Sequence, residues 1–139
     1  MGMTRSLFSV CTAALLLVAC GGPLKYEMRS TPKAPGSDGK LIASVHESQH
    51  QTEVELEVKN LPPPDRISDG ATDYVAWSRK NATATWTRLG SLKYESSERG
   101  GTMKGTVPET SFDFAVTAEK AALAATPSND VVFEQRVGE

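Results

Sequence analysis

The sequence predicts an all-β fold, and three features of the chain after residue 40 carry that prediction. Apolar and polar residues alternate over short stretches, as in "TEVELEVK" (52–59), where glutamates alternate with valine and leucine. Turn-forming clusters of Gly, Pro, Ser and Asn separate these stretches, and no long helical period occurs. We therefore expect an immunoglobulin/fibronectin-like antiparallel β-sandwich of about seven strands. An antiparallel β-barrel is the alternative.

Seven or eight stretches with strand character follow one another along the chain. The proline-rich segment "LPPPDRISDGA" (61–71) and the connection "AALAATPSND" (121–130) are the longest interruptions. In chain order, the predicted strands are 41–47, 52–59, 72–80, 84–90, 91–94, 102–107, 110–119 and 131–137. Their apolar positions are enough to fill one modest core, so residues 41–139 are expected to form one domain.

The first twenty residues predict a lipoprotein signal peptide. Arg5 precedes an apolar run over 7–19, which has the length of a signal-peptide h-region and is short for a membrane span. The run ends in Leu17-Val18-Ala19-Cys20, which resembles the lipobox of bacterial lipoproteins. The resemblance implies removal of residues 1–19 and attachment of several acyl chains to Cys20, enough for stable membrane binding. An uncleaved signal anchor and an ordinary signal peptide are the alternatives.

The residues beside the lipobox add two expectations. Gly21, in place of aspartate, implies by resemblance to Gram-negative lipoproteins that the protein is sorted to the outer membrane. The only other cysteine, Cys11, leaves with the signal peptide, so no disulfide is expected to hold the fold. The run after the cysteine mixes Gly, Pro, Ser and charged residues, which predicts a flexible tether over 20–40.

Charge argues against nucleic acid as a partner. Removal of residues 1–19 takes away one of 15 basic residues and none of 17 acidic residues, which leaves a net charge of −3. A mildly acidic chain without a basic stripe is poorly suited to a phosphate backbone. Apart from its anchor, the chain also lacks the basic clusters that attract anionic lipid.

The segment His46-Glu47-Ser48-Gln49-His50 has the spacing of a zinc-protease motif. On a helix, two histidines four residues apart can share one Zn²⁺, with the glutamate as general base. The flanking stretches alternate as strands do, so we expect the segment to be a hairpin connection carrying two surface histidines. A third ligand is also missing from the downstream sequence, where Glu53 and Leu56 stand in place of the glycine and histidine of the longer motif.

The second half of the chain resembles the extracytoplasmic C-terminal domain of anti-sigma-K factors. The matching segments are Tyr74-Val75-Ala76-Trp77, Leu89-Gly90-Ser91-Leu92, Val116-Thr117-Ala118-Glu119, Pro127 and Val131-Val132. The resemblance covers about residues 41–137 and implies a β-sandwich. Lys120, Ala121 and Ala122 stand where the family has glycines, and the chain shows neither a sigma-binding domain nor a spanning helix before the module. The resemblance therefore does not imply regulation of a sigma factor.

Four side chains are the candidates for special roles. Trp77 is expected to pack in the core, and Glu119 is expected to accept backbone hydrogen bonds in the loop that follows it. Tyr74 and Trp86 are the candidates for a ligand or partner surface, because exposed aromatic side chains stack on sugars and anchor protein interfaces. No phosphate loop, nucleophile elbow, Cys/His cluster or carboxylate pair points to catalysis or to a cofactor.

These observations predict a non-catalytic, lipid-anchored cell-envelope protein that presents a β-sandwich surface for binding or assembly. It binds the membrane through Cys20, and an envelope protein or a glycan is its expected partner. The first alternative is a carbohydrate- or peptidoglycan-binding module that uses Trp86 and Tyr74. The second alternative is a zinc metallohydrolase that uses His46 and His50.

Overall fold

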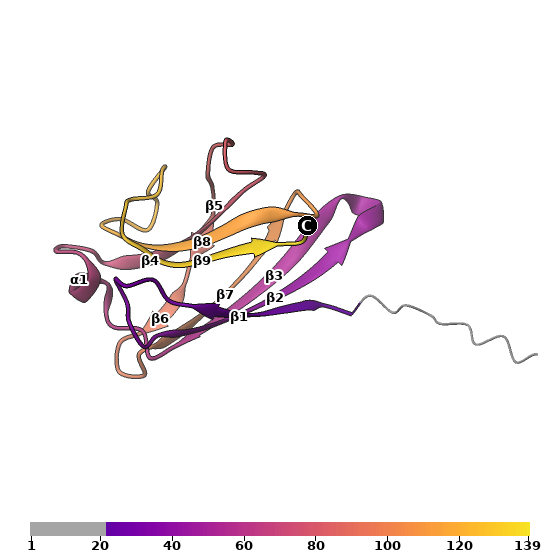
Figure 1. The fold of residues 1–139 in the computed structure, drawn as a ribbon. Coiled ribbons are helices and arrows are strands. Elements are labelled where there is room, and N and C mark those ends of the chain that lie inside the picture. Colours follow the sequence, from indigo (N-terminus) through magenta and orange to yellow (C-terminus); the bar gives the residue numbers. More distant parts are fainter. Residues whose placement is uncertain (1–21) are drawn as a thin grey trace, which may run out of the picture.

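A computed structural model describes residues 22–139, which form two antiparallel sheets packed face to face (Figure 1). The sheets have the strand orders β1-β2-β3-β7-β6 and β5-β4-β8-β9. The strands are β1 Leu24–Arg29, β2 Asp38–His46, β3 Gln51–Lys59, β4 Asp73–Arg79, β5 Thr87–Ser91, β6 Lys93–Glu95, β7 Gly100–Val107, β8 Phe112–Glu119 and β9 Val131–Val137. The predicted all-β sandwich is confirmed, with nine strands in this part of the chain where about seven were expected. The predicted signal peptide and Cys20 lie outside the described residues.

The order of the strands is that of an immunoglobulin-type sandwich. β2, β3, β7 and β6 form one layer, and β5, β4, β8 and β9 form the other, which matches two facing sheets joined by Greek-key connections. β1 is an additional strand at the edge beside β2. A four-residue helix, α1 (Pro64–Ile67), lies in the proline-rich segment between β3 and β4. Within residues 22–139, no helix has the length and apolar character needed to cross a bilayer.

The alternation along the strands places one side of each sheet in the core. In β3, Thr52, Val54, Leu56 and Val58 are buried, while the three glutamates between them are exposed. β4 and β8 differ, because nearly every residue in both strands is buried. These two central strands of the four-stranded sheet are therefore covered on their outer face as well as on their inner face.

The predicted flexible tether over 20–40 is wrong for the part that the structure describes. β1 pairs with β2 over its whole length, from Leu24 opposite Ala43 to Arg29 opposite Asp38. The chain then turns toward β9, where the Thr31 amide donates to the Val132 carbonyl at 2.9 Å. The Gly, Pro and Ser residues of this segment form the turn between two paired strands, so the same composition serves an ordered connection.

We expect the segment before residue 41 to be required for folding. A chain of residues 41–139 loses β1, the buried Met28 and Ala34, and the first residues of β2. It should lose at least about 3 kcal/mol of stability relative to a chain of residues 22–139, because buried apolar area and strand pairing are both removed. Urea unfolding followed by circular dichroism measures this difference. Equal unfolding midpoints for the two chains would contradict the assignment of β1 to the domain.

Candidate functional site

The zinc-protease motif closes a hairpin. His46 ends β2, residues Glu47–Gln49 form a single 3-10 turn, and His50 adopts a left-handed backbone conformation with φ of 52° before β3 begins. His46 Nε2 lies 3.6 Å from Glu53 Oε2 across the hairpin. Among the described residues, no group of three or more His, Cys, Asp or Glu side chains could hold a metal ion. The helix that the zinc metallohydrolase requires is thus replaced by a turn, and the predicted hairpin connection is confirmed.

Tyr74 is a buried structural residue, so its prediction as a ligand surface is wrong. Its side chain is 0% exposed, and its hydroxyl donates to the Pro62 carbonyl. Its ring packs edge-on against Tyr94, with 5.2 Å between the ring centroids. The Tyr94 hydroxyl in turn donates to the Leu61 carbonyl at 2.5 Å. Position 74 faces inward because strand alternation places it on the side of β4 that faces the other sheet, and the two tyrosines together hold the proline-rich segment against the core.

Trp77 is buried as predicted, but on the outer face of the four-stranded sheet. Its indole Nε1 donates to Thr117 Oγ1 at 2.8 Å, and the Thr117 hydroxyl donates to Glu119 Oε2 at 2.5 Å. The same carboxylate oxygen accepts the Ser128 amide at 2.9 Å, so Glu119 accepts a backbone hydrogen bond as predicted. Every buried side-chain polar atom in residues 22–139 has a partner, so this network is fully satisfied.

The connection between β8 and β9 folds back over this outer face; we call residues 120–130 the display loop. Arg88 Nε and Ser91 Oγ of β5 both donate to the Ala122 carbonyl, at 2.9 and 3.2 Å. Ser128 fastens the far end of the loop, because its hydroxyl donates to the Ala118 carbonyl at 3.0 Å. The loop is therefore held at Ala122 by side chains of β5, and at Ser128 by its own hydroxyl and by the Glu119 carboxylate.

Leu123 stands at the tip of the display loop with 83% of its surface exposed. It lies in the run Ala121-Ala122-Leu123-Ala124-Ala125, which is apolar throughout and mostly exposed or half-buried. Contiguous exposed apolar patches mark interaction sites in many proteins. The sequence alone predicts a connection here; its apolar composition is a signal, but only the structure shows that the run is exposed.

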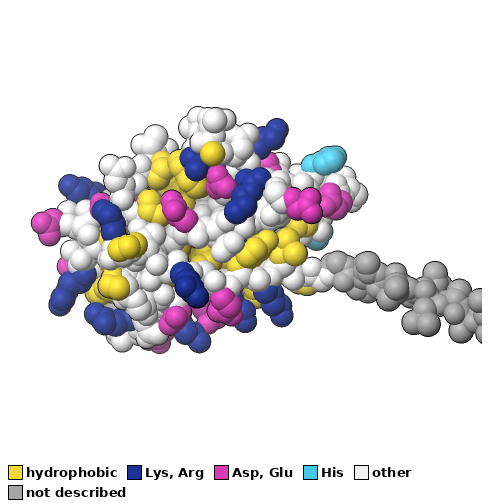
Figure 2. Space-filling view, viewed as in Figure 1, with side chains coloured by type: hydrophobic (Ala, Val, Ile, Leu, Met, Phe, Trp, Pro, Cys, Tyr) yellow, Lys and Arg dark blue, Asp and Glu magenta, His cyan; other side chains and the backbone are white. Residues whose placement is uncertain are grey.

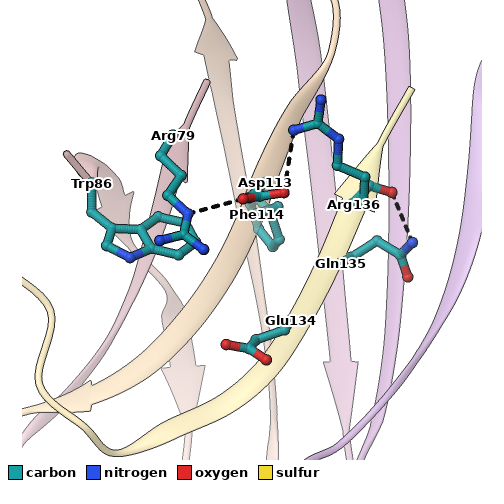
Figure 3. Close-up of a pocket in the computed structure, with 7 residues that line it drawn as sticks. All are labelled: Arg79, Trp86, Asp113, Phe114, Glu134, Gln135 and Arg136. Atoms are coloured by element: carbon teal, nitrogen blue, oxygen red, sulfur yellow. Dashed lines mark hydrogen bonds and ion pairs between the residues drawn. The ribbon is translucent and has the colours of Figure 1, made fainter. Parts of the chain in front are cut away.

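Trp86 is half-buried and lines a shallow pocket of about 240 Å³ (Figure 3). The Arg79 guanidinium carbon lies 4.3 Å from the centre of the indole ring, a cation–π contact. Arg79 Nε binds Asp113 Oδ2 at 2.9 Å, and Arg136 Nη1 binds Asp113 Oδ1 at 3.2 Å. Glu134 extends into the same space from β9 (Figure 3). The arrangement offers an aromatic surface beside hydrogen-bonding groups of both charges, which suits a neutral polar ligand such as a sugar.

The outer face of the five-stranded sheet is a mixed-charge surface. Glu55 is bound by Lys104 at 3.2 Å, and Glu57 by Lys59 at 3.2 Å. Figure 2 shows the molecule from the side, as in Figure 1, and there too basic and acidic side chains are interspersed and the hydrophobic ones form separate groups. A solvated surface of this kind contributes to solubility and provides no site by itself.

Comparison with known proteins leaves the chain without an assigned family. No protein-family model matches it, no curated protein matches it, and no solved structure matches it. The resemblance to the anti-sigma-K domain and to lipoprotein signals therefore remains a prediction from the residues quoted above.

We expect Tyr74→Phe to destabilise the domain by about 1–3 kcal/mol at neutral pH, because the Pro62 carbonyl loses its buried donor. Burial raises the pKa of Tyr74 above its ordinary value, with Tyr94 and Asp65 adding to the effect. The folded state thus holds the Tyr74 hydroxyl proton more tightly than the unfolded state does. The protonated hydroxyl contributes its full stabilisation below about pH 10, and this contribution declines as the pH rises further. As the pH is raised above about 10, Tyr74→Phe should therefore lose less stability than the wild type.

Chemical denaturation across this pH range measures both effects, with the half-buried Tyr26 changed to Phe as the matched control. Identical pH profiles for the wild type and Tyr74→Phe would contradict the buried position of this hydroxyl.

Proposed function

We propose that the protein is a non-catalytic, lipid-anchored cell-envelope protein that binds a protein partner through its display loop. The observation that carries this proposal is the exposure of Leu123 within an apolar run, on a loop that hydrogen bonds fasten to the sheet. The lipobox ending at Cys20 supports attachment to a membrane.

The way the loop is held favours recognition. Its two ends are tied to the sheet by the Ala122 carbonyl and by Ser128, so little conformational entropy is lost when a partner binds. Burying one exposed leucine side chain contributes about 1.5–3 kcal/mol. The small alanines on either side let a partner approach the loop backbone closely.

A second candidate function is carbohydrate or peptidoglycan binding, now through Trp86 alone. The pocket beside Trp86 is the observation that favours it, because an indole next to Asp113, Glu134 and Arg136 suits stacking on a sugar ring and bonding to its hydroxyls. Arg79 already covers one face of the indole, so a sugar has at most the other face available.

We expect Leu123→Ser to weaken capture of a specific protein partner from detergent-solubilised envelopes by about tenfold, the loss that corresponds to about 1.4 kcal/mol. Leu24→Ser is the matched control, since Leu24 is the other large hydrophobic residue that is exposed within residues 22–139. Quantitative mass spectrometry of the captured proteins measures the ratio. If no protein depends on Leu123 and purified peptidoglycan binds the wild type but not Trp86→Ala, the second function replaces the first.

The anchor has its own test. In a host that processes lipoproteins, the wild type should incorporate a labelled fatty acid and sediment with membranes, because several acyl chains on one residue give stable attachment. Cys20→Ser should lose the label and should not be processed at that site, whereas Cys11→Ser should behave as the wild type. Incorporation of label by the Cys20→Ser protein would disprove lipidation at this position.

A further inference from the structure

We propose that one end of the sandwich lies directly against the lipid surface, with the opposite end turned away from it. The proposal rests on the proposed lipidation of Cys20. The anchor end comprises the start of β1, the β2–β3 turn, the β7–β8 loop (108–111) and the residues after β9.

Chain length restricts how far the domain can leave the bilayer. Only Gly21, Gly22 and Pro23 separate Cys20 from Leu24. Four residue steps span at most about 14 Å when fully extended. Leu24 itself is fixed in the sheet opposite Ala43. A strand of nine residues such as β2 is about 30 Å long. The linker between Cys20 and Leu24 is therefore less than half as long as the sandwich, and the acyl chains hold the domain by the end at which β1 begins.

The strand pairing places several turns at that same end. The β2–β3 hairpin closes at His46 opposite Gln51, and Thr52 pairs with Val107 just before the β7–β8 loop. In Figure 1 the start of β1, this hairpin and the C-terminus lie together, while α1 lies at the other end of the sandwich. Both histidine side chains also lie at the anchor end (Figure 2).

The chemistry of the anchor end suits the boundary between headgroups and acyl chains. A groove of about 580 Å³ is lined by Leu24, Val45, Thr110, Ser111 and the two acidic residues Glu47 and Glu139, together with Gly22 and Gly138. Leu24 is 39% exposed there, and the hydroxyls beside it can bond to headgroups or water. Within the described chain, no lysine or arginine lines this groove. The acyl chains, rather than attraction to anionic lipid, therefore hold this end at the membrane.

The far end remains open to the solvent in this orientation. β8 runs from Phe112, beside the anchor end, to Glu119, where the display loop begins. The β6–β7 turn containing Ser97 lies at the same far end, since Gly101 pairs with Val58 near the end of β3. Leu123 is thus presented away from the bilayer, where a partner can reach it.

The experiment uses the lipidated full chain in vesicles, with Cys20 acylated and Cys11 removed, so that one introduced cysteine is the only free thiol. Ser48→Cys in the β2–β3 turn and Ser97→Cys in the β6–β7 turn are a matched pair, because both serines are exposed turn residues at opposite ends. A fluorophore on each thiol is quenched by headgroup-labelled lipid. With the ends about 30 Å apart, quenching at position 48 should exceed that at position 97 by at least about threefold.

Two further measurements test the orientation separately from the lipid anchor. Inserting about 20 Gly/Ser residues between Gly22 and Pro23 adds a flexible span of about 25 Å and should reduce the difference between the two labels. Neutral and anionic vesicles should give the same quenching ratio. Equal quenching at both positions in protein that carries lipid on Cys20 would overturn the orientation and leave the anchor standing. Protein that fails to acquire lipid on Cys20 would overturn the anchor and the orientation together.

Discussion

The hydrogen-bond chain from Trp77 through Thr117 to Glu119 is the interaction on which the exposed surface of this protein depends. It lies on the outer face of the four-stranded sheet, where a carboxylate and an indole are buried together. Burial of these groups is favourable only while each has its partner. Glu119 finds its second donor in the Ser128 amide, so satisfying the buried acid also fixes where the display loop returns to the sheet.

This arrangement explains why the sandwich has two unlike outer faces. The five-stranded sheet faces solvent with paired charges, such as Lys104 with Glu55. The display loop is fastened to the outer face of the four-stranded sheet through Arg88, and the Trp86 pocket lies on the same sheet. An apolar loop tip and an aromatic pocket therefore both belong to one layer, with the loop extending from the end opposite Leu24.

Strand alternation predicted most of the fold from local sequence. The pattern around Leu56 placed β3 and its inward side correctly, because one face of a half-buried strand must be apolar. β1 was missed, since its residues are mostly exposed and their pattern is weak; pairing with β2 and the contact with β9 order it instead. Tyr74 was misplaced because the sequence shows that a residue is aromatic and does not show which side of a doubly buried strand faces the other sheet.

The amino-acid sequence by itself determined the all-β class and the hairpin at His46, and it supplies the expectation of a lipid anchor at Cys20. These follow from local periodicity and from a contiguous signal, neither of which needs distant contacts. Only the tertiary structure decided that Trp77 is covered from outside, that Leu123 is exposed on a fastened loop, and that three residues separate Cys20 from the folded domain. Each of these depends on segments far apart in the chain, such as Arg88 with Ala122, and their pairing cannot be deduced from local pattern.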